Sequence, residues 1–288
     1  MNPESLIHAD GRVVAAIDAS AYTGSVCRHA AWAAGRLGAP LSMVHVIDPA
    51  DRVAPLDLAG NLILGEREAL LRELGELDAT RAKLAQQHGR LLLQQARQLA
   101  GVDTADLWLR HGALVDTLVE LEDEVRLFVV GKRGEHADFA RGHLGREVER
   151  VVRSVHRPLL VASRTFQPIQ RVLVAYDGSA TTRKALAMVA ESPLLRGFDI
   201  HLVTVGGGEG SERGLGDAAR VLDGAGLRAT TEVIDGHPDE ALAAYVDRQR
   251  IDLLVMGAYG HSRIRQLIVG STTTAVMRNC QVPVLLLR

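Results

Sequence analysis

The chain has 288 residues, of which 47% are hydrophobic and 24% charged, and its formal net charge is −2. This composition is typical of a soluble globular protein of about two domains, and it excludes a generic nucleic-acid or anionic-membrane binder, which needs a large basic excess. Two cysteines are too few for a disulfide framework. The N-terminus has no apolar signal core and no apolar run is long enough to span a membrane, so we expect a cytoplasmic protein that binds neither membranes nor nucleic acid.

Three landmarks occur twice along the chain, in the same order. The first pair is RVVAAIDAS and RVLVAYDGS, which contain Asp18 and Asp177. The second pair is LFVVGKRG and LLVMGAYG, which begin their glycine motifs at Gly131 and Gly257. The third pair is RPLLV and VPVLL, at residues 157–161 and 282–286. Three ordered matches indicate an internal duplication.

The first copy is the longer of the two. The two aspartates are 159 residues apart, whereas Gly131 and Gly257 are only 126 apart, so the first copy holds about 33 extra residues. The obvious place is a stretch near residues 51–99 that is rich in Leu, Glu, Arg and Gln, and in which we predict a lengthened second helix over 70–99. This helical insertion could cover the core or bind a partner, and its role stays open.

The second copy reads as alternating strands and helices. Short apolar runs predict buried parallel strands, and the segments between them have helical character. The predicted strands are 172–176, 200–205, 229–234, 252–256 and 284–287, and the predicted helices are 180–190, 212–225, 239–249 and 272–280. This alternation predicts an α/β fold with an open parallel five-stranded sheet in each copy and helices on both of its faces.

The last strand of each copy suggests how the halves assemble. Pro158 and Pro283 each open an apolar strand, which is typical of a sheet edge, and an exposed apolar edge promotes aggregation. The short link over 163–170 favours mutual pairing of these edges, which would make the chain an intramolecular pseudo-dimer. Shielding by a helix or by another chain, including a homodimer of chains, is the alternative.

A glycine-rich loop in the second copy has the character of an anion site. Gly257 and Gly260 follow an apolar strand. After nine intervening residues, Gly270 and Ser271 lead into a helix that we expect to begin near Thr272. Free N–H groups and the positive end of a helix face an anion in such an arrangement, and glycines let the backbone approach it. The alternative is an ordinary N-cap with no ligand.

Asp177 is expected at the same crevice. It ends the first strand of the second copy, and ligands of open α/β sheets bind beyond the carboxyl ends of the strands, where the strand order reverses. A carboxylate there can accept hydrogen bonds from ribose hydroxyls or from a base amine. Asp177 can also cap the following helix, and the two roles are compatible.

These motifs resemble the ATP-binding signature of the universal stress protein family. The resemblance covers essentially the whole chain, as two tandem domains at 1–163 and 171–288, each with the strand order 3-2-1-4-5 of adenine-nucleotide α-hydrolase-like folds. It implies that ATP, with Mg²⁺, binds in the second domain. In that case Asp177 and Val205 meet the adenosine, Met256 lies beneath the nucleotide or simply in the core, and the loop glycines line the ribose and phosphates. Phosphate oxygens would be bound by three residues, Gly270, Ser271 and Thr272.

The first domain departs from this signature and is predicted to be degenerate. Asp18, Gly131, Gly134 and Gly145 are present, but ten residues separate the last two, and Arg146 stands where the hydroxyl residue belongs. An arginine there places bulk and positive charge in the anion pocket. Three interpretations stay open: Arg146 fills the site, the basic residues of this loop bind another anion, or ATP binds despite the changes.

The leading functional hypothesis is a stress-response protein that binds ATP in its second domain and acts on protein partners that the sequence does not identify. That bound nucleotide would change these interactions is implied by the family resemblance and not by the residues themselves. We expect at most slow ATP hydrolysis, because no catalytic residue and no metal-ligand cluster can be recognised. The alternatives are a nucleotide-independent interaction scaffold and, less favoured, an enzyme that cleaves the α–β bond of ATP.

Overall fold

The structure is a computed structural model that describes residues 8–48, 64–134, 145–208, 210–258 and 271–288. In the first half the elements are β1 (Arg12–Ala16), α1 (Thr23–Leu37), β2 (Leu41–Ile47), α2 (Leu64–Ala100), β3 (Asp106–His111), α3 (Leu114–Glu120), η2 (Glu122–Glu124), β4 (Val125–Gly131), α4 (Arg146–Ser154) and β5 (Leu159–Ala162). In the second half they are β6 (Arg171–Ala175), α5 (Ala180–Glu191), η3 (Pro193–Leu195), β7 (Asp199–Val205), α6 (Ser211–Gly224), β8 (Ala229–Ile234), α7 (Pro238–Gln249), β9 (Leu253–Gly257), α8 (Ser271–Asn279) and β10 (Val284–Leu287).

The predicted α/β fold is confirmed, including the strand order within each half. The first half has the order β3-β2-β1-β4-β5, and the second half has the equivalent order β8-β7-β6-β9-β10. All strand pairs within a half are parallel. The order therefore reverses between the first and fourth strands of each half, which places a crevice at their carboxyl ends.

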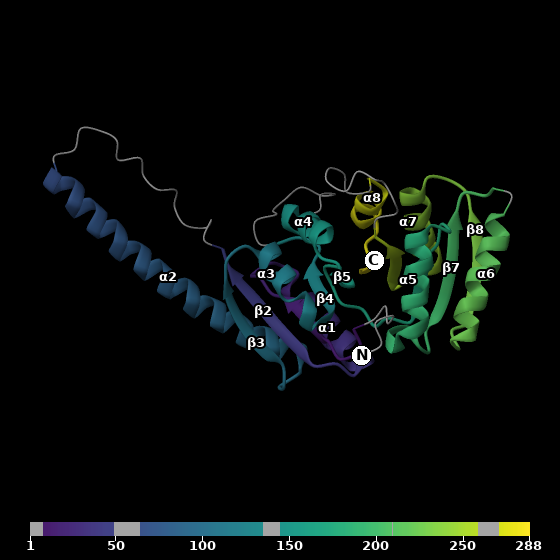
Figure 1. Ribbon diagram of the computed structural model, residues 1–288, viewed down its shortest axis with the longest axis horizontal. Coiled ribbons are helices and arrows are strands. Elements are labelled where there is room, and N and C mark those ends of the chain that lie inside the picture. Colours follow the sequence, from purple (N-terminus) through teal and green to yellow (C-terminus); the bar gives the residue numbers. More distant parts are fainter. Residues whose placement is uncertain (1–7, 49–63, 135–144, 209, 259–270) are drawn as a thin grey trace.

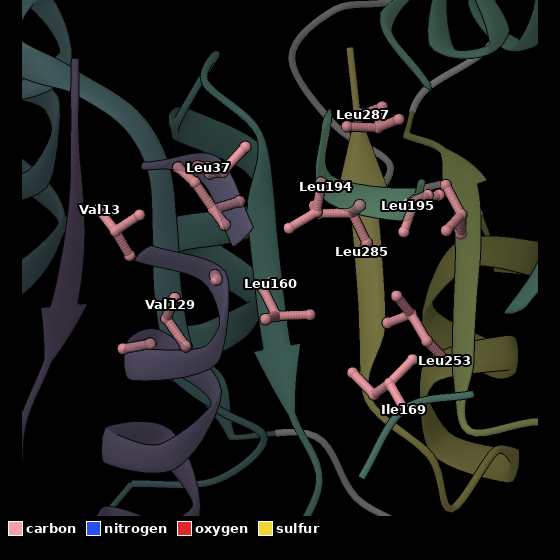
Figure 2. Close-up of a cluster of buried hydrophobic side chains, with 14 of the residues drawn as sticks. Val13, Leu37, Val129, Leu160, Ile169, Leu194, Leu195, Leu253, Leu285 and Leu287 are labelled. Carbon is pink, nitrogen blue, oxygen red and sulfur yellow. The ribbon is translucent and has the colours of Figure 1, made fainter. Parts of the chain in front are cut away.

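The two halves join through their last strands into one ten-stranded sheet. β5 and β10 pair antiparallel, with Leu160 opposite Leu285 at the centre of the pairing. Both side chains are almost completely buried, and Figure 2 shows them between the ribbons of the two halves. Because β5 and β10 satisfy each other, neither is left as an exposed edge. The prediction that the two edges cover each other within the chain is thus confirmed.

Helices cover both faces of the sheet, as a parallel sheet requires. One hydrophobic cluster lies between the sheet and α1, α2, α5 and α6, and a second lies on the other face beneath α3, α4, α7 and α8. Alternate residues of a strand point to opposite faces, so Val13 enters the first cluster and Val14 the second. Both clusters contain residues of the two halves, so each face has a continuous apolar core.

Side-chain contacts also cross between the halves. The Arg36 Nε atom donates a hydrogen bond of 3.1 Å to the Leu194 carbonyl, and its guanidinium lies 4.6 Å from the centre of the Phe198 ring. On the other face, Arg278 forms a 3.0 Å ion pair with Glu149. These contacts flank the β5–β10 joint and fix the halves relative to each other.

The second helix of the first half is far longer than its counterpart. α2 has 37 residues, whereas α6 has 14. Its C-terminal part packs on β2 and β3, and its N-terminal part extends away from the sheet (Figure 1). The predicted long helix is therefore observed, while the preceding residues 49–63 lie outside the described part of the chain. Across the described helices, none is both long enough and apolar enough to cross a membrane.

Because β9 is buried, shortening one of its side chains should lower the free energy of unfolding substantially. Leu254 has 0% of its surface exposed and packs in the cluster beneath α7 and α8. Leu254→Ala should lower the free energy of unfolding by about 2–5 kcal/mol, measured by urea denaturation, because it removes apolar contacts and leaves a cavity. Val221→Ala on α6, where the side chain is 48% exposed, should change it by less than about 0.5 kcal/mol. Equal costs would contradict the assignment of β9 to the core.

Candidate functional site

A cavity of about 220 Å³ opens at the carboxyl ends of β6 and β7. Its lining combines the end of β6, the end of β7 and the start of α6, in the residues Tyr176, Asp177, Gly178, Thr204, Gly210, Ser211 and Gly214. A second cavity, of about 40 Å³, lies between the halves and has a mainly apolar lining that includes Leu37, Leu194 and Leu285. Only the first has polar groups directed to one place and the size to hold part of a small ligand.

Asp177 is held in position by the turn that follows β6. Its Oδ1 atom accepts hydrogen bonds from the Ser179 backbone N–H at 2.9 Å and from the Thr182 hydroxyl at 2.7 Å. Burial raises the pKa of Asp177, but the hydrogen bonds from Thr182 and Ser179 outweigh it and hold the pKa below its usual value. The side chain is therefore an ionised, oriented acceptor at the mouth of the cavity, and it also supports the start of α5.

The helix cap itself belongs to a neighbouring residue. Ser179 is the N-cap of α5, and its side chain accepts a hydrogen bond from the Thr182 N–H. Gly178 makes the preceding turn with φ +72°, a conformation that favours glycine. The alternative in which Asp177 caps this helix is therefore wrong: Ser179 is the cap, and Asp177 supports it by accepting a hydrogen bond from the Ser179 N–H.

The opposite wall comes from the glycine-rich loop after β7, which sequence analysis did not assign to the site. Gly206 and Gly210 have φ values of +85° and +117°, so the chain turns sharply into α6. The Ser211 hydroxyl accepts a hydrogen bond from the Gly208 N–H at 3.1 Å. Thr204 is fixed by a 2.8 Å hydrogen bond from its hydroxyl to the Tyr176 carbonyl. A run of glycines at the end of a predicted strand was the available indication of this wall.

The remaining predicted strand-end residues share this edge of the sheet but do not line the cavity. Val205 is half-buried at the end of β7, and Met256 is 8% exposed in the core cluster beneath α7 and α8. Of the two positions expected for Met256, beneath a nucleotide or in the core, the structure shows the core position. Gly257 ends β9 against α5: a Cβ atom there would lie 3.2 Å from the methyl groups of Thr181 and Thr182. Because Gly257 has no side chain, the end of β9 can lie close to the start of α5 at the crevice.

The phosphate-loop prediction falls largely outside the described residues. Gly260 and Gly270 are among those not described, and for Ser271 and Thr272 only the backbone is described. That backbone begins α8 at Ser271, one residue before the predicted start. The predicted helix start is therefore observed to within one residue.

The first half brings its corresponding residues close together. A Cβ atom at Gly131 would lie 2.9 Å from the Cβ atom of Tyr22, and one at Gly134 would lie 3.3 Å from the Asp18 Oδ2 atom. Gly145 is the N-cap of α4, and its N–H donates to the Lys132 carbonyl at 3.3 Å. Residues 132–134, which directly follow β4, thus lie against both Asp18 and the start of α4. The side chain of Arg146, the first residue of α4, lies outside the described part of the structure.

Lys132 is directed away from the crevice of its own half. Its ammonium group donates a hydrogen bond to the carbonyl of Cys280, which follows the last residue of α8. Burial lowers the pKa of Lys132 to about 8, although the neighbouring Cys280 opposes this shift. The C-terminal end of a helix is a favourable place for a cation. Lys132 therefore connects the halves.

Metal-binding residues do not cluster in the described part of the chain, where no group of three or more His, Cys, Asp and Glu side chains could hold a metal ion. Asp177 is the one carboxylate among the residues that line the 220 Å³ cavity.

Comparison with known proteins decides the family. The family model of the Universal stress protein family matches residues 11–163 and, separately, 168–288. The chain belongs to the universal stress protein family. Universal stress protein Slr1230 from Synechocystis sp. is 41% identical over 279 residues, which cover 94% of this chain and 97% of that protein. A universal stress protein from Mycolicibacterium smegmatis is 23% identical, with 96% of each chain covered.

Solved structures agree with this universal stress protein fold over the full length. A universal stress protein from Archaeoglobus fulgidus has a TM-score of 0.68 at 18% identity, with 97% of this chain and 98% of that chain covered. A functionally unknown protein from Pseudomonas aeruginosa has a TM-score of 0.65 at 15% identity, with 97% and 93% covered. The fold of nearly the whole chain therefore occurs in other solved structures.

The hydrogen bond from the Thr182 hydroxyl is one cause of the lowered pKa of Asp177, and its removal is a test of that cause. Thr182→Val removes a donor to the ionised carboxylate, so the pKa of Asp177 should rise toward its ordinary value. Stability that depends on the ionised form is present at neutral pH and is lost as the pH falls through the folded-state pKa. An NMR titration of the Asp177 carboxyl carbon measures the shift. Thr231→Val, at an exposed position on β8, is the isosteric control and should leave the curve unchanged; an unchanged curve in Thr182→Val would contradict the proposed cause.

Proposed function

We propose that this universal stress protein binds ATP in its second half, and that the bound nucleotide changes how the chain interacts with protein partners. The observation that carries the proposal is the 220 Å³ cavity at the carboxyl edge of β6 and β7, with the Asp177 carboxylate at its mouth. The position agrees with the general place of ligands in open α/β sheets. The family resemblance adds the identity of the nucleotide.

The residues of the cavity fit the nucleoside end of such a ligand. Asp177 is held ionised by two donors and keeps lone pairs that can accept hydrogen bonds from ribose hydroxyls. The glycines at the start of α6 leave room for a flat base beside the Ser211 hydroxyl. The cavity is smaller than a full nucleotide, so the phosphates would extend toward the start of α8.

The start of α8 is suited to the phosphate end. A helix N-terminus presents free N–H groups and a partial positive charge, and the residues there are Ser271 and Thr272. We propose that these two and Gly270 bind the phosphate oxygens, that Gly257 and Gly260 line the ribose and phosphates, and that Val205 lies at the adenosine. Mg²⁺ is commonly held by one or two carboxylates together with substrate phosphates. Asp177, the one carboxylate of the cavity lining, is assigned to the ribose, so a Mg²⁺ ion would arrive with the phosphates rather than reside in the protein.

The first half is proposed to be structural. Its residues 132–134 lie against Asp18 and the start of α4, and Lys132 is occupied by the Cys280 carbonyl. This arrangement weakens the alternative in which Lys132 helps Arg133 and Arg146 to bind another anion. We accordingly propose a degenerate domain at 1–163 and a nucleotide-binding domain at 171–288, with one ATP per chain.

The two halves differ at the first residue of α4 and α8, and exchanging these residues tests whether ATP binds at the start of α8. α4 and α8 both have nine residues and begin at the equivalent positions Arg146 and Ser271. Ser271→Arg should weaken ATP binding in Mg²⁺ at least tenfold in isothermal titration calorimetry, because the side chain would occupy the phosphate position. Arg146→Ser is the matched control and should leave that affinity unchanged.

Measurements on the unmodified protein test whether it binds ATP at all. It should bind one ATP per chain, and nucleotide should be detected by mass spectrometry after denaturation of freshly purified protein. Absence of both would overturn ATP binding and favour the nucleotide-independent scaffold. Equal affinity in Ser271→Arg would place the ligand elsewhere.

A further inference from the structure

The long helix α2 carries a row of leucines on its solvent side. Leu70, Leu77, Leu84 and Leu91 follow one another at intervals of seven residues. The last three are 50%, 59% and 64% exposed, which is unusual for large apolar side chains in a row. Successive members differ by only about 20° around the helix, so the four form one stripe along it. We call these four residues the leucine stripe.

The leucine stripe faces away from the body of its own domain. The opposite side of α2 packs on the sheet through Gly89, Leu93 and Ala96, all buried. At Gly89 the approach is so close that a Cβ atom would lie 2.7 Å from the Leu109 side chain and 2.8 Å from that of His45. Even in this packed part of the helix Leu91 remains exposed. The stripe is therefore not used by the fold that holds α2 in place.

About half of α2 contains no fully buried residue. No residue over 70–88 is buried, and Figure 1 shows this part of the helix extending away from the sheet. The 25 residues over 64–88 correspond to about 37 Å at 1.5 Å per residue. Helical stability in water comes mostly from packing of an apolar face, so a projecting helix with a heptad leucine stripe fits a helical partner.

The charges along α2 indicate what that partner is. Over 70–78 there are three acidic residues, Glu73, Glu76 and Asp78, and one arginine. Over 81–97 there are four basic residues and no acidic one: Arg81, Lys83, Arg90 and Arg97. The helix thus has an acidic outer part and a basic inner part. Its electrostatic complement is the same helix in the opposite direction.

We infer that this chain forms a two-fold symmetric dimer in which α2 of one copy pairs antiparallel with α2 of a second copy along the leucine stripe. The row is self-complementary under this symmetry: with Leu77 opposite Leu84, Leu70 comes opposite Leu91. Asp78 then faces Lys83 of the second copy. A parallel pair would instead place the acidic parts together and the basic parts together, which is unfavourable. The stripe lies opposite the packed face, so the two domain bodies stay on the outer sides of the helix pair.

The mass of the full chain in solution tests the dimer. Light scattering coupled to size-exclusion chromatography should give twice the 31.0 kDa of one chain. Leu84→Glu places a charge in the stripe and should return the mass to that of one chain. Ala79→Glu adds the same charge on the exposed opposite side of the helix and should leave the dimer intact. Unchanged circular dichroism at 222 nm in both variants shows that the helix is retained.

Cysteine cross-linking tests whether the two helices run antiparallel. Both native cysteines are buried and should not compete with the introduced ones. Leu70→Cys and Leu91→Cys should cross-link when the two variants are mixed, whereas Leu91→Cys alone should not. Self-cross-linking of Leu91→Cys would overturn the antiparallel arrangement. A monomeric unmodified chain at about 100 µM, or a dimer that survives Leu84→Glu, would overturn the proposal, whether or not the helix then binds lipid vesicles or another protein.

Discussion

The antiparallel pairing of β5 with β10 is the constraint on which the rest of the molecule depends. Each half ends in a short strand whose residues are all buried, and an exposed edge on such an apolar strand would promote aggregation. In this chain the two strands pair with each other, with Leu160 opposite Leu285. The pairing converts two five-stranded sheets into one sheet of ten strands, and both faces of the joint are covered by continuous apolar clusters.

The same pairing separates the two crevices in space. Strands within a half are parallel, but the two halves run in opposite directions across the joint. The carboxyl edge of the first half therefore lies on the opposite side of the sheet from that of the second half. This geometry explains how Lys132, just after β4, reaches the Cys280 carbonyl just before β10. A duplicated fold of this kind can retain a ligand site in one half while the equivalent loop of the other half becomes a structural contact.

The halves also differ in the helix after their second strand, and this difference has two consequences. In the second half a glycine-rich turn leads directly into α6, whose first residues line the cavity beside Asp177. In the first half the corresponding helix is α2, which packs on the sheet through its C-terminal part and extends away from it over its N-terminal part (Figure 1). Its exposed large apolar residues include Leu77, Leu84 and Leu91. One copy thus has a short helix whose first residues line a cavity, and the other has an extended helix with exposed leucines.

Much of this architecture follows from local sequence. The duplicated landmarks, the apolar runs of the strands and the helical segments between them predicted the α/β class and the long helix in the first half, because these depend on periodicity along the chain. Asp177 was predicted at the strand-end crevice for the same reason. The strand order was expected only from the family resemblance of the motifs, because periodicity does not say which strands are neighbours. The tertiary structure alone decided that Thr182 and Ser179 hold this carboxylate ionised, that Thr204 and Ser211 form the facing wall, and that Lys132 turns to the other half. It also decided which side of α2 is covered. These features depend on contacts between residues far apart in the chain, and neither periodicity nor motif spacing encodes them.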